Sequence, residues 1–191
     1  LQGYFLQLTD LLMSHSTHES LQIRNIVAEA IGRLTAAFPD DMTSLLRDGL
    51  TATDNLMLAT VARSVKFSGS KTKDIATLGL LTQSLAGLAA NADPEVKKNA
   101  LEGLMTIIHN NWASLKGELR SELPRIEAFA LQETAIRKEL IEEVELGPFR
   151  HKVDNGLPMR KAAFQLLETL FEQASDNIDL SRIVETIVRT G

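Results

Sequence analysis

A helical stripe recurs three times along the chain and constrains the fold more than any other feature. The copies read IRNIVAEAIGRL at residues 23–34, VKKNALEGLMTI at 96–107 and MRKAAFQLLETL at 159–170. Each begins with an aliphatic and a basic residue, and small or apolar residues follow four, seven and eight positions after the first. These spacings place the side chains on one face of a helix, where small residues let a neighbouring helix approach closely. The stripe therefore predicts a helix that packs against other helices.

These helices are expected to be the second members of helix pairs. A weaker copy, MLATVARSVKF at 57–67, begins 34 residues after Ile23 and 39 before Val96, spacings typical of two-helix repeats. Another amphipathic segment precedes each copy, and a fifth such segment begins near Asn177. The preceding segments are 1–14, 40–51, 74–91 and 113–131. The chain is thus predicted to hold about four and a half helix pairs.

Turn residues agree with this division. Asp93-Pro94 supplies an N-cap acceptor and a proline for the first helical position, and Phe38-Pro39-Asp40-Asp41 is expected to close one helix and cap the next. Asp-Pro before an aliphatic-basic pair is similar to the hallmark of HEAT repeats. We expect repeats at about 1–38, 40–67, 71–110 and 113–174, with the start of a fifth at 177–191.

The predicted fold class is all-α, an α-solenoid of HEAT-type helix pairs. A single pair cannot bury its apolar face, so pairs stack and present an extended concave surface that suits protein partners. Hydrophobic residues make up 44% of the chain but aromatic residues only 5%, which predicts the aliphatic core of stacked helices.

Composition also narrows the partners and the compartment. The formal net charge of −5 argues against a nucleic-acid partner, because phosphate binding needs clustered cations. The absence of cysteine excludes disulfides and thiolate metal sites and favours a reducing compartment, so we expect the cytoplasm and the nucleus. No apolar run reaches the roughly 18 residues of a membrane span, so no membrane partner is expected. The chain starts at Leu1 and ends in mid-pattern, and we interpret it as a fragment of a longer solenoid.

An insertion breaks the period in the fourth repeat. The offset from Val96 to Met159 is 63 residues, and the excess falls at about 132–156. Alternating apolar residues surround Gly147-Pro148 in this segment, a pair that suits a type II′ turn. We therefore predict one inserted β-hairpin at about 135–156. Helix competes in its first half, because RKELIEEVEL also fits a helix with an i,i+4 ion pair.

The surroundings of the hairpin lead to two further expectations. Asp154 and Asn155 are expected to cap the next helix, with Pro158 in its first turn. An isolated two-stranded hairpin is marginally stable in water, so we expect a partner to support it. The alternative is that it only packs along the ridge of the solenoid.

Several residues invite a chemical role that their context does not support. His15 and His18 are spaced like two zinc ligands, but the segment SHSTHES is typical of a polar loop between helices. His109 is expected to end a helix, and Gly69-Ser70-Lys71-Thr72 to be a connecting loop, since it lacks the glycines of a phosphate-binding loop. The carboxylates of Glu142, Glu143 and Glu145 have no partner nucleophile. We therefore predict no catalytic residue, no metal site and no cofactor.

The inserted segment carries a resemblance to a known family. EVELGPFRHKVDNG at 143–156, followed by RKAAF at 160–164, resembles the C-terminal region of the cullin-associated, neddylation-dissociated regulators of cullin-RING ubiquitin ligases. The resemblance extends through RNIVAEAIGRLT at 24–35 and IRKELI at 136–141 and covers most of the chain. The HEAT repeats alone would also fit importins, clathrin adaptors or phosphatase scaffolds.

The resemblance implies a non-enzymatic protein that wraps an unmodified cullin with its RING subunit. Its hairpin would occupy the place of the substrate adaptor and so promote receptor exchange, and attachment of the ubiquitin-like modifier would block binding. Phe149 would be the anchor of an apolar tip. The cullin-binding residues that the resemblance implies are Glu143, Val144, Glu145, Leu146, Gly147, Pro148, Phe149, Arg150, His151, Lys152, Val153 and Asp154.

A second function remains open from the sequence. A transport or trafficking scaffold that carries cargo on its concave face explains the repeats equally well. It leaves the hairpin without a role.

Overall fold

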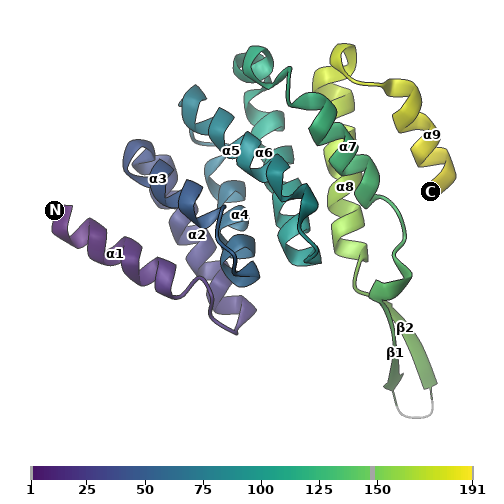
Figure 1. The fold of residues 1–191 in the computed structure, drawn as a ribbon, viewed down its shortest axis with the longest axis horizontal. Coiled ribbons are helices and arrows are strands. Elements are labelled where there is room, and N and C mark those ends of the chain that lie inside the picture. The colour runs from purple at the N-terminus through teal and green to yellow at the C-terminus, as the bar shows by residue number, and fades with distance from the viewer. Residues whose placement is uncertain (1, 147–148, 191) are drawn as a thin grey trace.

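Paired helices stack side by side in two layers along the chain (Figure 1). The structure, a computed structural model, describes residues 2–146 and 149–190. The first helices of the pairs are α1 (Gln2–Ser14), α3 (Pro39–Gly49), α5 (Ile75–Gly87), α7 (Leu123–Glu133) and α9 (Leu180–Thr190). The second helices are α2 (Leu21–Ala37), α4 (Asn55–Ser68), α6 (Pro94–Leu119) and α8 (Leu157–Ala174). The prediction of an all-helical solenoid with one hairpin is confirmed.

The second helices form the continuous core of the stack. α2 packs on α4, α4 on α6 and α6 on α8, and their shared stripe buries aliphatic side chains completely. Ile31, Val65 and Leu104 are among the residues with no exposed surface. Gly32 lets α2 approach α4 so closely that an added Cβ would lie 2.6 Å from Phe67 Cβ and against the Ser64 carbonyl oxygen. The small residues of the stripe therefore set the spacing between neighbouring repeats.

Aspartates begin the helices in the way that the sequence indicates. The Asp93 carboxylate accepts hydrogen bonds from the Glu95 and Val96 amides at 2.8 and 3.1 Å, which confirms the predicted cap. Asp54 and Asp74 cap α4 and α5 through the amides three residues on. These caps satisfy N–H groups that have no partner within the helix.

The turn between α2 and α3 differs in detail from the prediction. The Phe38 amide donates to the Leu34 carbonyl at 2.7 Å and closes α2, as expected. Asp40 and Asp41 do not cap α3, however, because Pro39 already begins the helix and places them in its first turn. There they complement the helix dipole instead.

The break expected between residues 110 and 113 is wrong, because α6 continues to Leu119. Leu115 and Leu119 extend its buried stripe, and the Asn111 side-chain amide donates to the carbonyls of Gly69 and Ile107 at 2.6 and 3.2 Å. His109 consequently lies exposed within the helix rather than at its end. None of the helices in the described ranges has the length and apolar character of a membrane span.

The insertion between α7 and α8 is a hairpin, so the competing helix is wrong. After the short 3-10 helix η2 (Lys138–Leu140), β1 (Ile141–Leu146) pairs antiparallel with β2 (Phe149–Asp154). Gly147-Pro148, the predicted type II′ turn, lies outside the described residues. The other 3-10 helices are η1 (Leu88–Ala90) after α5 and η3 (Ser175–Asn177) after α8.

Replacing a glycine should test the close approach of α2 and α4. Gly32→Ala should destabilise the protein by about 1–3 kcal/mol, because the new methyl group meets the backbone of α4. Gly117→Ala is the matched control, since an added Cβ there meets nothing within 4 Å, and it should stabilise by about 0.5–1 kcal/mol. Urea unfolding measures both. Equal effects would mean that the helices are not in the contact described.

Candidate protein-binding hairpin

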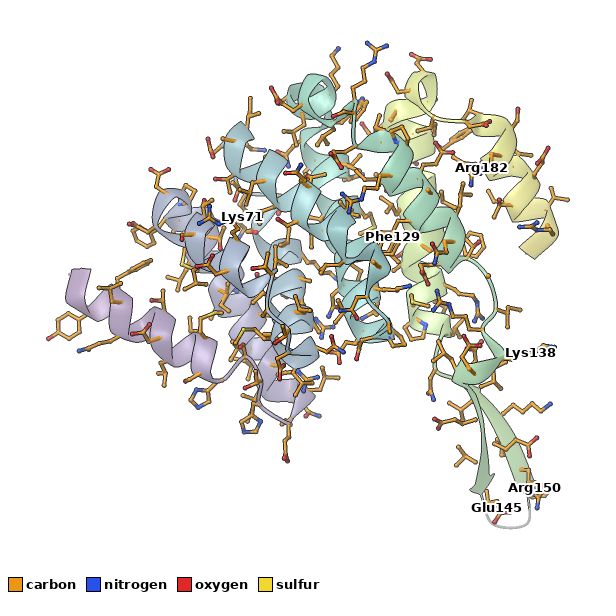
Figure 2. The ribbon with its side chains drawn as sticks, in the orientation of Figure 1. Lys71, Phe129, Lys138, Glu145, Arg150 and Arg182 are labelled. Carbon is orange, nitrogen blue, oxygen red and sulfur yellow. The ribbon has the colours of Figure 1, made fainter. Side chains whose placement is uncertain are left out.

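The two strands project away from the helical stack, beyond the N-terminal ends of the second helices (Figures 1 and 2). Their register runs from Ile141 opposite Asp154 to Leu146 opposite Phe149. Residues directly opposite each other in an antiparallel pair share a face, and faces alternate along each strand. The register therefore decides which side chains can contact a partner together.

One face of the hairpin is charged. Glu143 lies opposite Lys152, and Glu145 lies opposite Arg150. The Arg150 Nε and Glu145 Oε1 atoms are 3.4 Å apart, and both side chains are more than two-thirds exposed. An ion pair this exposed contributes little to stability, so the charges mainly keep this face hydrated.

The other face is mainly apolar and open to solvent, although Glu142 and His151 also lie on it. It carries Val144 opposite His151, Glu142 opposite Val153, and the position of Phe149 beside the turn. Phe149 is 67% exposed, Val153 42% and Val144 38%. Exposed apolar side chains gathered on one projecting element indicate a protein-binding surface. We call Val144, Phe149, His151 and Val153 the apolar face.

The base of the hairpin is tied to α8 and to the segment before β1. The Asn155 amide donates to the Leu140 carbonyl at 2.9 Å, and the Gly156 amide donates to the Asp154 Oδ1 atom at 2.9 Å. Asp154 Oδ2 lies 2.7 Å from the Arg160 Nη1 atom. The predicted cap of α8 is therefore wrong. Gly156 is the N-cap residue and no side chain caps the helix, because the Asp154 carboxylate is held by Arg160 and by the turn.

This contact shifts the acid strength of the aspartate. The hydrogen bond from Arg160 is the largest influence and lowers the pKa of Asp154. Desolvation opposes it, and the Gly156 amide lowers the pKa further. The carboxylate therefore stays ionised, and the base stays tied, at pH values where a free aspartate would take up a proton.

The basic residue of each repeated stripe has a structural partner that the sequence did not reveal. Arg24 Nη2 lies 3.1 Å from Glu95 Oε2 on α6, Lys97 Nζ lies 2.6 Å from Glu133 Oε1 on α7, and Arg160 pairs with Asp154 at the hairpin. Each pair connects a second helix to another element. The only sequence signal was the recurrence of a cation directly after the aliphatic residue.

The Lys97 pair holds the segment that leads into the hairpin. Glu133 is fully buried, and its second carboxylate oxygen accepts from Arg137 Nη2 at 2.6 Å. The carboxylate thus links α6, the last turn of α7 and the segment before η2. Both of its oxygens are satisfied, as a buried charge requires.

The other residues with possible chemistry lie apart from the hairpin. His15 and His18 lie in the loop between α1 and α2, as predicted, with ring centroids 6.4 Å apart. The His18 Nδ1 atom accepts a hydrogen bond from the Ser20 amide. Residues 69–72 connect α4 and α5, as predicted. No group of three or more metal-ligating side chains occurs within residues 2–146 and 149–190.

The fold defines a class of protein: a HEAT-type α-solenoid segment that carries one projecting β-hairpin. Comparison with known proteins identifies the family within this class. The TIP120 family model, described as TATA-binding protein interacting (TIP20), matches residues 119–191, which include the hairpin.

Curated relatives match most of the chain. "Cullin-associated NEDD8-dissociated protein 1" of Drosophila melanogaster is 36% identical over 93% of this chain, and that of Arabidopsis thaliana is 32% identical over 95%. A relative from Emericella nidulans, named as the C-terminal part of the same protein, is 31% identical over 87%. The chain spans 14–16% of the length of these relatives. The chain belongs to the family of the cullin-associated NEDD8-dissociated proteins.

Acid should release the base of the hairpin only below the usual range of an aspartate. The folded-state pKa of Asp154 is depressed, so the contribution of this contact is complete above the unfolded pKa and is lost as the pH falls through the folded value. The chemical shift of the Gly156 amide during titration reports this transition. Its midpoint should lie below that of Asp154 in an unfolded peptide of residues 149–160, and Asp154→Asn should abolish it. Equal midpoints would contradict the contact with Arg160.

Removing Lys97 should destabilise the fold strongly. Lys97→Met leaves the buried Glu133 with Arg137 alone and should cost about 3 kcal/mol in the free energy of unfolding, at the low end for a broken buried pair. Arg33→Met is the matched control, because the Arg33–Glu29 pair is exposed and should contribute about 0.3–0.5 kcal/mol. Denaturant titration compares the two variants. Losses of similar size would show that Glu133 is not buried as described.

Proposed function

We propose that this segment belongs to a non-enzymatic regulator of cullin-RING ubiquitin ligases and that its hairpin contacts the cullin. The observation that carries the proposal is the exposed apolar face on an element that projects from the solenoid. Relatives that match nearly the whole chain are named as cullin-associated, which supports the choice of partner.

The hairpin acts in this proposal by occupying the position of the substrate adaptor on an unmodified cullin. The cullin and its RING subunit are held along the solenoid, and the apolar face fills the adaptor's contact. Because both cannot bind at once, the regulator removes one adaptor and lets another enter. Attachment of the ubiquitin-like modifier to the cullin prevents this binding.

The shape of the hairpin suits such competition. Phe149 is a large side chain beside the turn, and it is two-thirds exposed. Burying an aromatic side chain in a pocket of another protein is the commonest source of strong binding at an interface. The charged face, with Arg150 and Lys152, stays in water or lies at the rim of the contact.

Truncating the aromatic anchor should weaken cullin binding. Phe149→Ala should cost about 2 kcal/mol or more of binding free energy, because it empties a central pocket of the interface. Lys152→Ala changes the same hairpin on its charged face and should have an effect of about 0.5 kcal/mol or less. Affinity for a purified, unmodified cullin-RING complex is the measurement. Similar losses for the two variants would show that the apolar face is not the binding face.

Adaptor displacement tests the mechanism itself. The intact protein should release the adaptor from an unmodified cullin-RING complex, and a variant with residues 144–153 replaced by a short Gly-Ser linker should bind the cullin without releasing it. Unchanged displacement by that variant would assign the function to the helical surface, as expected of a scaffold that carries cargo there.

A further inference from the structure

A groove of about 390 Å³ lies at the foot of the hairpin. The second helices begin at this end of the stack (Figure 1). Residues from four successive second helices line it together with the end of the hairpin. They include Leu21 of α2, Arg63 of α4, Pro94 and Lys98 of α6, and Asn155 and Pro158 beside the hairpin. Its lining combines apolar side chains with charged ones.

The two carboxylates in the groove are already committed to partners within the protein. Asp93 caps α6 through two backbone amides. Glu95 accepts hydrogen bonds from the buried Arg24 guanidinium through both of its oxygens, at 3.4 and 3.1 Å. Among the described residues, neither carboxylate forms an ion pair with Arg63 or Lys98.

The cations in and beside the groove are less well neutralised. Lys98 and Lys66 share one carboxylate, that of Glu102, at 3.3 and 3.2 Å. The Arg63 guanidinium donates to the neutral side-chain amide of Asn25, and within the described part of the chain it forms no ion pair. The lining holds two cations and two carboxylates, and Arg63 is the cation left without a carboxylate partner among the described residues.

We infer that the groove receives an acidic segment of the same protein partner that holds the hairpin. An aliphatic side chain of that segment lies on Leu21 and Pro158, and a carboxylate pairs with Arg63. A guanidinium suits this contact because its planar donors match the two oxygens of a carboxylate. The inference rests on the proposed function, in which that partner is the cullin.

The position of the groove argues for one partner at both sites. Asn155 and Pro158 line the groove, and Asn155 directly follows β2. A protein that covers the apolar face as far as Val153 therefore lies over the edge of the groove. Two contacts on one partner reinforce each other, because the first raises the effective concentration at the second.

Substitution of one arginine tests the proposed contact in the groove. Arg63→Met removes the charge and keeps an unbranched side chain, and it should weaken binding of an unmodified cullin-RING complex about tenfold, as expected for a lost charge-assisted hydrogen bond. Arg33→Met is the matched control, because Arg33 carries the same charge on α2 but is already paired with Glu29, and it should change affinity less than twofold. Melting temperatures identify variants that are destabilised. Lys98→Met, on the rim contributed by α6, provides a second test if Arg63→Met unfolds.

The dependence of binding affinity on salt concentration distinguishes a lost charge contact from lost packing. Raising NaCl from about 50 to about 300 mM should weaken binding of the unchanged protein more than that of Arg63→Met, because the screened contact is already absent in the variant. Affinity within twofold of the unchanged protein for both Arg63→Met and Lys98→Met, with the same salt dependence, would overturn the inference.

The two proposals fail in different ways. If Phe149→Ala weakens binding and the groove variants do not, the hairpin contact stands and the groove contact is wrong. If the unchanged protein does not bind the cullin-RING complex, the proposed function and the groove contact are both wrong.

Discussion

The stacking of each second helix on the next is the interaction on which the rest of the structure depends. No helix pair can bury its apolar stripe alone, so α2, α4, α6 and α8 must lie close together. Gly32 permits the approach of α2 to α4, since an added Cβ there would meet α4 within 3 Å. An added Cβ at Gly103 would instead lie 2.8 Å from Leu85 of α5. The regular offset of the second helices also aligns their N-terminal ends along one edge (Figure 1). The hairpin and the charged groove both lie at this edge.

Ion pairs at that edge connect the repeats and position the hairpin. Arg24, Lys97 and Arg160 occupy equivalent places in the three stripes, and each contacts a carboxylate from a different element. The first two join one repeat to a later helix, whereas Arg160 joins α8 to the end of β2. The basic residue at the start of each stripe therefore links helices of the stack in two repeats and holds the hairpin in the third. The basic side chains of the Arg24 and Lys97 pairs are buried, so these pairs hold the helices together. The charges on the hairpin are exposed instead.

The hairpin separates two roles between its faces. The charged face keeps a projecting element hydrated, and the apolar face leaves Val144, Phe149 and Val153 open for a partner. Part of the apolar surface of these side chains stays exposed, so its favourable burial is left for binding. Arg63 in the groove is likewise left for a partner, because its charge has no carboxylate partner among the described residues.

Some features of this structure follow from local sequence patterns, and others depend on tertiary contacts. Periodicity sufficed for the helix pairs, for the Asp93 cap and for the hairpin around residues 147–148, because helix phase, capping and strand alternation act over a few residues. It failed at residues 110–113, where Asn111 and the continuing apolar stripe hold α6 together through contacts with the preceding repeat. The partners of the basic residues, the foot of the hairpin and the groove came only from the tertiary structure. The Arg24–Glu95 and Lys97–Glu133 pairs and the groove join residues far apart in the chain, which only the stacking of whole helices brings together. The Arg160–Asp154 pair depends on the way the hairpin returns to α8.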